Sequence, residues 1–182
     1  KVHLPVLQRF DCHGCTECCR RGWPIPVTVD EFARIRQHHW SDAVLDTDES
    51  FEWYHEGGTA HPYRLAQRGD GACVFLAADG RCRIHVAMGS AAKPLACRLY
   101  PFVVVPAERG VGISLRFDCP SVAFNRGRPM PKHRSTAEKL ADEVTDEDSF
   151  EPPFASRTEM LAWGDLRRIA ESADGLLADQ TH

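Results

Sequence analysis

Residues 12–19 read Cys12-His13-Gly14-Cys15-Thr16-Glu17-Cys18-Cys19. Two residues between cysteines let the chain fold back, so that both sulfurs reach one metal ion at about 2.3 Å. The spacing repeats at once, from Cys12 to Cys15 to Cys18, and Gly14 permits the tight turn that such a wrap needs. Three thiolates at this spacing resemble the bacterial ferredoxin run, which holds a [4Fe–4S] cluster. The segment therefore predicts a metal site and favours iron–sulfur over zinc.

Four more cysteines follow at Cys73, Cys82, Cys97 and Cys119. A proline follows Cys119, as it follows the last cysteine of ferredoxin runs, so Cys119 is a candidate fourth ligand for the first three. Neighbouring side chains tend to point apart, so we expect Cys18 and Cys19 to serve different roles. A second four-sulfur site would then combine the cysteines left over: Cys19, Cys73, Cys82 and Cys97. A single cluster with spare cysteines is equally compatible with the sequence.

Two other uses of the thiols have to be weighed. In an oxidising compartment, eight cysteines would form four disulfides. Residues 1–10 show no signal peptide, however, and three thiols fall within seven residues, so we expect metal binding in the cytoplasm. Zinc remains an alternative because thiolates in pairs suit it as well. The imidazoles of His13 and His85 are further candidate ligands, and Trp23 is expected to pack over the cluster and limit solvent access.

The overall composition excludes two classes of partner. The chain has 22 basic against 26 acidic residues and a net charge of −4, whereas a nucleic-acid-binding protein normally has a basic excess. No apolar run approaches the roughly 18 residues that cross a bilayer. We therefore expect neither nucleic acid nor membrane as a partner. Apolar residues make up 43% of the chain, which is ordinary for a globular protein.

The local patterns predict short helices and one hairpin. Thr28 and Glu31 form a capping box that begins a helix over 28–40. Gly80 marks a tight turn, and a short helix over 85–88 is expected to end at Gly89. Residues 102–105 and 111–117 form the best candidate for a β-hairpin, because apolar residues alternate strictly in the second segment. Residues 41–72 are expected to form loops with a short strand or a short helix among them.

The C-terminal third has a different character. Residues 126–134 are rich in Pro, Arg and Gly and look like a linker. Capping boxes at Ser135 and Ser156 predict two helices, the first ending near Val144, and residues 175–182 are expected to fray. We predict an α+β fold: an irregular, metal-stabilised cysteine-cluster domain with several helices and a short β-hairpin. The predicted division is a metal-binding domain over 1–125 and, packing on it, a linker with a helical appendage over 126–182.

The order of the motifs resembles a known family. It comprises Cys12-x2-Cys15-x2-Cys18-Cys19, Cys73-Val-Phe-Leu, Gly80-Arg-Cys82-Arg-Ile-His85 and Lys93-Pro94-x2-Cys97-Arg98-Leu-Tyr-Pro101-Phe. These segments look like the CxxCxxCC-type zinc- or iron-chelating domain, often called the YkgJ-type cysteine-cluster proteins. The resemblance covers roughly residues 10–125. It implies that Arg98, next to Cys97, donates hydrogen bonds to cluster sulfides or to a bound carboxylate, with a surface salt bridge as an equal alternative.

One branch of this family adds an enzymatic hypothesis. Cys18-Cys19-Arg-Arg-Gly22-Trp23-Pro-Ile25 and Cys119-Pro-Ser-Val-Ala are similar to segments of flagellin lysine-N-methylase. That resemblance implies an iron–sulfur cluster and S-adenosylmethionine used to methylate a protein substrate. The spacing C-x3-C-x2-C of radical S-adenosylmethionine enzymes is missing, because position 22 is glycine. Three functions follow: a redox or metal-handling protein with a redox partner, a methyltransferase-like enzyme, and a structural zinc scaffold.

Overall fold

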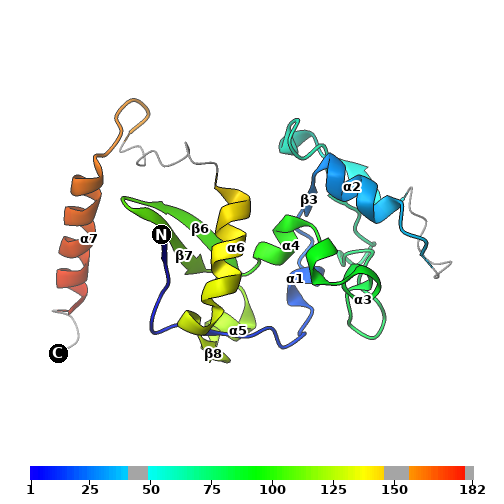
Figure 1. Ribbon diagram of the computed structural model, residues 1–182, viewed down its shortest axis with the longest axis horizontal. Coiled ribbons are helices and arrows are strands. Elements are labelled where there is room, and N and C mark those ends of the chain that lie inside the picture. Colours follow the sequence, from blue (N-terminus) through cyan, green and yellow to red (C-terminus); the bar gives the residue numbers. More distant parts are fainter. Residues whose placement is uncertain (41–48, 146–155, 179–182) are drawn as a thin grey trace. The chain divides into compact units, whose positions relative to one another are not determined.

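The computed structural model describes residues 1–40, 49–145 and 156–178. Short helices alternate with small sheets of two or three strands, so the predicted irregular α+β class is confirmed (Figure 1). Within these residues, no helix is both long and apolar enough to cross a membrane.

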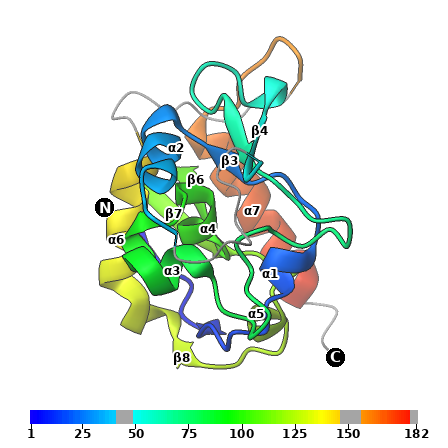
Figure 2. The same ribbon diagram turned by 90° about the vertical axis from the view of Figure 1, so that its right-hand side faces the viewer.

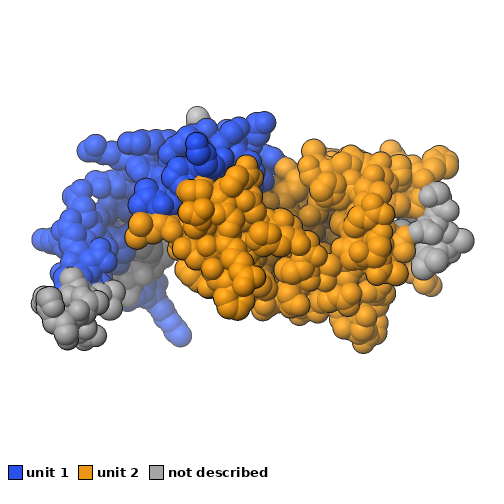
Figure 3. Space-filling model, turned by 90° about the horizontal axis from the view of Figure 1, so that it is seen from below, with its two compact units in different colours: residues 1–6, 104–114, 130–182 blue, residues 7–103, 115–129 orange. Residues whose placement is uncertain are grey.

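The chain divides into two compact units that are interleaved in sequence (Figure 3). Unit 1 consists of residues 1–6, 104–114 and 130–182, and unit 2 of residues 7–103 and 115–129. All eight cysteines belong to unit 2. The boundary predicted at residue 125 follows the chain order, whereas these units exchange segments.

Unit 2 is built on a small antiparallel sheet of order β3-β5-β4. Its strands are β3 (Pro26–Val27), β5 (Tyr63–Leu65) and β4 (Phe51–Trp53), with Val27 opposite Tyr63 and Phe51 opposite Leu65. A short 3-10 turn, η1 (His55–Gly57), joins β4 to β5. Strands β4 and β5 and the turn η1 lie within 41–72, where loops with a short strand or helix were predicted. Residues 41–48 of that range are outside the described part of the chain.

Helix α2 (Val29–Arg36) begins where the sequence predicts, after Thr28, and ends earlier than predicted, at Arg36. The Thr28 hydroxyl accepts from the Glu31 backbone N–H at 3.2 Å, and the Glu31 carboxylate accepts from the Thr28 backbone N–H at 3.0 Å. This reciprocal pair satisfies two N–H groups that a helix start leaves open. Glu31 is only 7% exposed, and its second oxygen accepts from the Leu95 backbone N–H at 2.7 Å. The same carboxylate therefore ties α2 to the start of a later helix.

The core of unit 2 gathers apolar side chains from all of these elements. Phe75 is 1% exposed and packs with fully buried residues of β3, α2 and β5. Ile84 and Ala92 add to this core from α3 (Arg83–Met88) and η2 (Ser90–Ala92), and α4 (Leu95–Leu99) comes next in the chain. Helices α3 and α4 are the green helices labelled in Figure 2. Gly89 ends α3 with a φ of 87°, as predicted, and α3 begins two residues before its predicted start. The predicted turn at Gly80 is also present, since Leu76 and Cys82 form a bridge across it.

A second pair of strands closes unit 2 around the first cysteines. Strand β2 (Arg9–Phe10) pairs antiparallel with β8 (Arg128–Pro129), and the short helix α5 (Pro120–Ala123) lies between the two in sequence. The Ser121 hydroxyl donates to the Asp11 carbonyl at 2.7 Å, and Arg128 forms an ion pair with the Asp11 carboxylate at 2.8 Å. The backbone just before Cys12 is thereby held to residues 121–128.

Unit 1 packs helix α6 (Arg134–Val144) against β1 (Val2–His3) and the turn η3 (Met130–His133). Strand β1 pairs parallel with β7 (Gly110–Leu115), with Val2 opposite Val111, and β7 pairs with β6 (Phe102–Ala107). The last helix is α7 (Trp163–Ala178). The predicted hairpin is therefore present. Phe117, however, lies beyond β7 and is 62% exposed, so the alternating pattern ends at Leu115.

Three predictions for the C-terminal third are wrong. Residues 126–134 are not a plain linker, because they form β8 and η3, and Met130 and His133 are buried. Helix α6 starts at Arg134, with no side-chain cap, so Ser135 lies inside the helix. Helix α7 starts at Trp163 rather than after Ser156, and it continues through Gly175 to Ala178, where fraying was predicted. Residues 179–182 are outside the described part.

Candidate metal centre

Two neighbouring thiols face each other on the short helix α1 (Glu17–Arg20). The sulfur atoms of Cys18 and Cys19 lie 3.9 Å apart. The expectation that their side chains point apart is therefore wrong. The hydrogen bond between them, together with burial, raises the pKa of Cys18, whereas the same bond lowers the pKa of Cys19. Cys19 is thus the sulfur of the pair that ionises first.

Backbone contacts bring Cys73 beside this pair. The Cys73 N–H donates to the Cys19 carbonyl at 2.8 Å. Gly71 and Gly22 both have a positive φ, and a Cβ added to Gly71 would lie 3.9 Å from the Arg20 carbonyl and from the Gly22 Cα. The chain around residue 72 therefore runs close beside the end of α1. This approach aligns two cysteines that are 54 positions apart in the sequence.

Cys82 and Cys97 complete a group of five thiols. Cys82 directly precedes α3, where the Arg83 N–H donates to the Phe75 carbonyl at 2.9 Å, and Cys97 lies on α4. Thiolate charge on Cys73, Cys82 or Cys97 acts to raise the pKa of Cys19. Thiolate charge on Cys73, Cys82 or Cys18 likewise acts to raise the pKa of Cys97. We call the five residues the thiol cluster: Cys18, Cys19, Cys73, Cys82 and Cys97.

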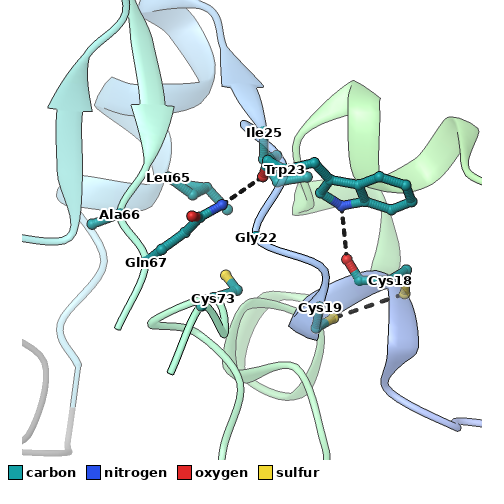
Figure 4. A pocket seen from close by; sticks show the side chains of 10 residues that line it. Cys18, Cys19, Gly22, Trp23, Ile25, Leu65, Ala66, Gln67 and Cys73 are labelled. Carbon is teal, nitrogen blue, oxygen red and sulfur yellow. Dashed lines mark hydrogen bonds between the residues drawn. The ribbon is translucent and has the colours of Figure 1, made fainter. Parts of the chain in front are cut away.

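A small pocket opens on the thiol cluster (Figure 4). Cys18, Cys19 and Cys73 line one part of it, and Leu65 and Ala66 line another. The Trp23 indole N–H donates to the Cys18 carbonyl at 2.9 Å, and the Gln67 amide donates to the Trp23 carbonyl at 2.6 Å. Trp23 therefore lies beside Cys18, and its packing over a bound cluster stays a prediction.

Burial keeps part of the cluster protonated. Burial, together with the charge of neighbouring thiolates, raises the pKa of Cys73 from 9.0 to about 11 and that of Cys97 from 9.0 to about 12. The Lys93 ammonium opposes this effect at Cys18 and at Cys97. Several thiolates cannot share so small a space without positive charge. A bound cation would supply that charge and release the thiol protons.

The other predicted ligands lie outside this group. Cys12 and Cys15 are exposed, as are His13 and His85. Cys119 is 6% exposed and lies beside Tyr100, whose pKa is raised by burial and by the nearby Cys119 and Asp118. Across the described residues, no three or more His, Cys, Asp or Glu side chains are gathered tightly enough to close on an ion as they stand. All eight cysteines, which lie within the described ranges, are free thiols.

Arg98 is half-buried on α4, next to Cys97. Its Nε donates to the Lys93 carbonyl at 3.1 Å. This bond braces the turn that presents Cys97. Contact with a cluster sulfide or a bound carboxylate stays a prediction for this residue.

Two residues at the site were missed by the sequence analysis. Lys93 entered only as part of a family motif, although its charge reaches two of the thiols. Its position four residues before Cys97 is the signal that a search for cations near cysteines would have used. Glu31 was identified only as a helix cap, and its second contact, to the helix that carries Cys97, has no signature in the local sequence.

Comparison with known proteins agrees with this geometry. Residues 11–125 match the family described as "CxxCxxCC: Putative zinc- or iron-chelating domain". An uncharacterized protein of Methanocaldococcus jannaschii is 31% identical over 94 residues, which are 51% of this chain and 29% of that protein. The match thus spans less than a third of the relative's length. No solved structure matches the chain.

Proposed function

Because this chain belongs to the CxxCxxCC family of zinc- or iron-chelating domains, we propose that its thiol cluster binds a single zinc or iron ion and that the protein serves in metal handling. The observation that supports this proposal best is the separation of 3.9 Å between the sulfurs of Cys18 and Cys19. Metal–sulfur bonds of about 2.3 Å in a tetrahedral site place neighbouring sulfurs about 3.8 Å apart. The pair is therefore spaced like two corners of such a site.

The same separation bears on the kind of metal centre. In a [4Fe–4S] cluster each cysteine binds a different iron, so the cysteine sulfurs stand much farther apart than in a mononuclear site. The close pair on α1 favours one ion held by several thiolates. This differs from the [4Fe–4S] cluster that the spacing of the cysteines favours by itself. The two remaining ligands of a tetrahedral site would come from among Cys73, Cys82 and Cys97 by rotation of their side chains toward the pair.

Anaerobic purification followed by elemental analysis tests the proposal. We expect one zinc or iron ion per chain and no broad absorbance at about 400 nm, the region where iron–sulfur clusters absorb. The variant Cys18→Ser/Cys19→Ser should lose the metal. The matched control is Cys119→Ala, which removes a cysteine outside the thiol cluster and should keep it. A brown protein with several irons per chain, or full metal content in the double serine variant, would refute the proposed centre.

The finer predictions are tested separately. The [4Fe–4S] cluster, a redox partner, a protein substrate and a cytoplasmic location stay predictions. The methyltransferase hypothesis requires that the protein bind S-adenosylmethionine. Titration calorimetry on the metal-loaded chain under anaerobic conditions measures this directly, and an absence of heat would remove that hypothesis.

A further inference from the structure

The loop of residues 12–15, Cys12-His13-Gly14-Cys15, differs from the thiol cluster in its surroundings. Both of its cysteines are exposed, whereas those of the cluster are half-buried. Gly14 has a φ of 66°, and a Cβ added there would find no atom within 4 Å. The loop therefore projects into open space and offers two thiols to solvent.

Both ends of this loop are anchored. On one side, Asp11 is bound by the Ser121 hydroxyl and by Arg128. On the other side, the Thr16 hydroxyl accepts from the Arg20 Nε at 3.0 Å, and the Thr16 carbonyl accepts from the Cys19 N–H at 2.8 Å. The fold thus fixes the position of the loop relative to α1.

This geometry points to a second metal site with a distinct task. We propose that Cys12 and Cys15 form a loading site, which takes a zinc ion from a donor and passes it to Cys18 and Cys19. The inference rests on the proposed function and adds an entry route to it. Two residues between the cysteines suit the capture of one ion. Only two protein thiolates would hold that ion, so its other positions stay open for exchange, unlike those of a closed structural site.

The distance for transfer is short. Cys15 and Cys18 are three positions apart in the sequence, so their Cα atoms can be at most about 11 Å apart even in an extended chain. Capture forms two zinc–sulfur bonds as the bonds to the donor break, and the two thiol protons leave to solvent. In the transfer, bonds to Cys18 and Cys19 form as their thiol protons leave, and the bonds to Cys12 and Cys15 break. The two released thiolates take up the two protons, so the proton count is unchanged. Zinc keeps its charge throughout, so no oxidant or reductant is needed.

The test compares the rate of loading with the final affinity. Metal-free protein is mixed with zinc bound to a weak fluorescent chelator, and the transfer of zinc is followed by stopped flow. In Cys12→Ser/Cys15→Ser we expect loading to slow by about tenfold or more, because zinc must then reach Cys18 and Cys19 without the exposed thiolates that capture it first. The zinc stoichiometry and the equilibrium affinity should stay unchanged. Glu17→Ser, an exposed position beside the loop, is the matched control and should load at the normal rate.

Two outcomes would overturn the inference. Equal loading rates would show that zinc enters without the loop, and a loss of stoichiometry would make Cys12 and Cys15 permanent ligands.

A second measurement avoids dependence on the folding of the variant: brief alkylation of the folded wild-type protein, with modified cysteines identified by mass spectrometry. Protein alkylated at Cys12 and Cys15 alone should load as slowly as the double variant, and normal loading would contradict the inference. Wild-type protein that binds neither zinc nor iron would instead refute the proposed function.

Discussion

At the level of single residues, the burial of Cys73 and Cys97 makes the stability of the folded chain depend on pH. Both pKa values lie above the ordinary 9.0, at about 11 and about 12. In the unfolded chain these thiols ionise near pH 9, whereas in the folded metal-free protein they hold their protons longer. Their contribution to stability is therefore complete below pH 9 and is lost as the pH rises toward 11 and 12.

We expect the free energy of unfolding of the metal-free protein to fall between pH 9 and 12, by at most about 1.4 kcal/mol per pH unit for each thiol. Urea titrations at several pH values measure this slope. In Cys73→Ala/Cys97→Ala the slope in this range should be shallower. An equal slope in that variant would assign the loss to other groups.

The contacts of Ser121 lead to a prediction about the hydrogen bonds that anchor the loop of residues 12–15. Its hydroxyl is buried and donates to the Asp11 carbonyl, so Ser121→Ala leaves that carbonyl without its partner. We expect a loss of about 1–2 kcal/mol in the free energy of unfolding. Arg128→Met removes an ion pair whose arginine is exposed, and should cost less than about 1 kcal/mol. The reverse order, measured by thermal unfolding, would show that the ion pair is the stronger anchor.

Spacing along the chain identified every cysteine as a candidate but not the neighbours of each. Pairing by proximity in sequence placed Cys18 with Cys12 and Cys15, whereas its sulfur contacts Cys19. The short helix α1 turns both side chains to one side, and its start at Thr16 depends on a left-handed residue, φ 65°, that has no strong signature. Lys93 was missed for a related reason, because its effect depends on the folded position of α4.

At the level of elements, two identical signatures had opposite outcomes. The Ser/Thr-x-x-Glu pattern occurs at Thr28 and at Ser135, and only the first one caps a helix. Before Thr28 the chain arrives as a strand, so that residue has extended backbone, with ψ 165°, as a cap requires. Before Ser135 the turn η3 buries Met130 and His133 and starts α6 one residue early. Packing of the preceding turn, which the local pattern does not contain, decided the difference.

This pair makes a matched test. Thr28→Ala should lower the free energy of unfolding by about 1 kcal/mol, because the backbone N–H of Glu31 loses the hydroxyl that accepts its hydrogen bond. Ser135→Ala should change it by less than about 0.5 kcal/mol, as is usual for an exposed position without a special contact. Chemical denaturation under the same conditions compares the two. A cost at Ser135 as large as that at Thr28 would contradict the absence of a cap on α6.

The whole molecule shows the limit of reading domains along the chain. The fold class followed from short patterns, since helix caps, the Gly80 turn and the hairpin are local. The interleaved units did not, because the parallel pairing of Val2 with Val111 joins residues far apart in sequence. Contacts between residues so far apart in sequence depend on which apolar faces the other elements leave uncovered. The periodicity of apolar residues within one segment does not contain this information. Segment 104–114 therefore belongs to a different unit from the residues on either side of it.

The placement of all cysteines in unit 2 predicts a local effect of metal removal. A chelator should increase hydrogen exchange of residues 17–23, 71–76 and 93–99, because an ion that joins thiols on separate segments also restrains the loops between them. Residues 104–114 and 134–144 of unit 1 should exchange at an unchanged rate. Hydrogen–deuterium exchange with mass spectrometry resolves the two sets. Uniform loosening of both units would show that the ion stabilises the chain as a whole.

The indole of Trp23 lies against the pocket and donates to the backbone of Cys18. The fluorescence of Trp23 is therefore sensitive to metal binding by the neighbouring thiols. A closed-shell ion such as zinc would change the wavelength and intensity of that fluorescence modestly, whereas iron would quench it. The chain thus carries its own optical indicator of which element it has taken up, and no added dye is required to follow it.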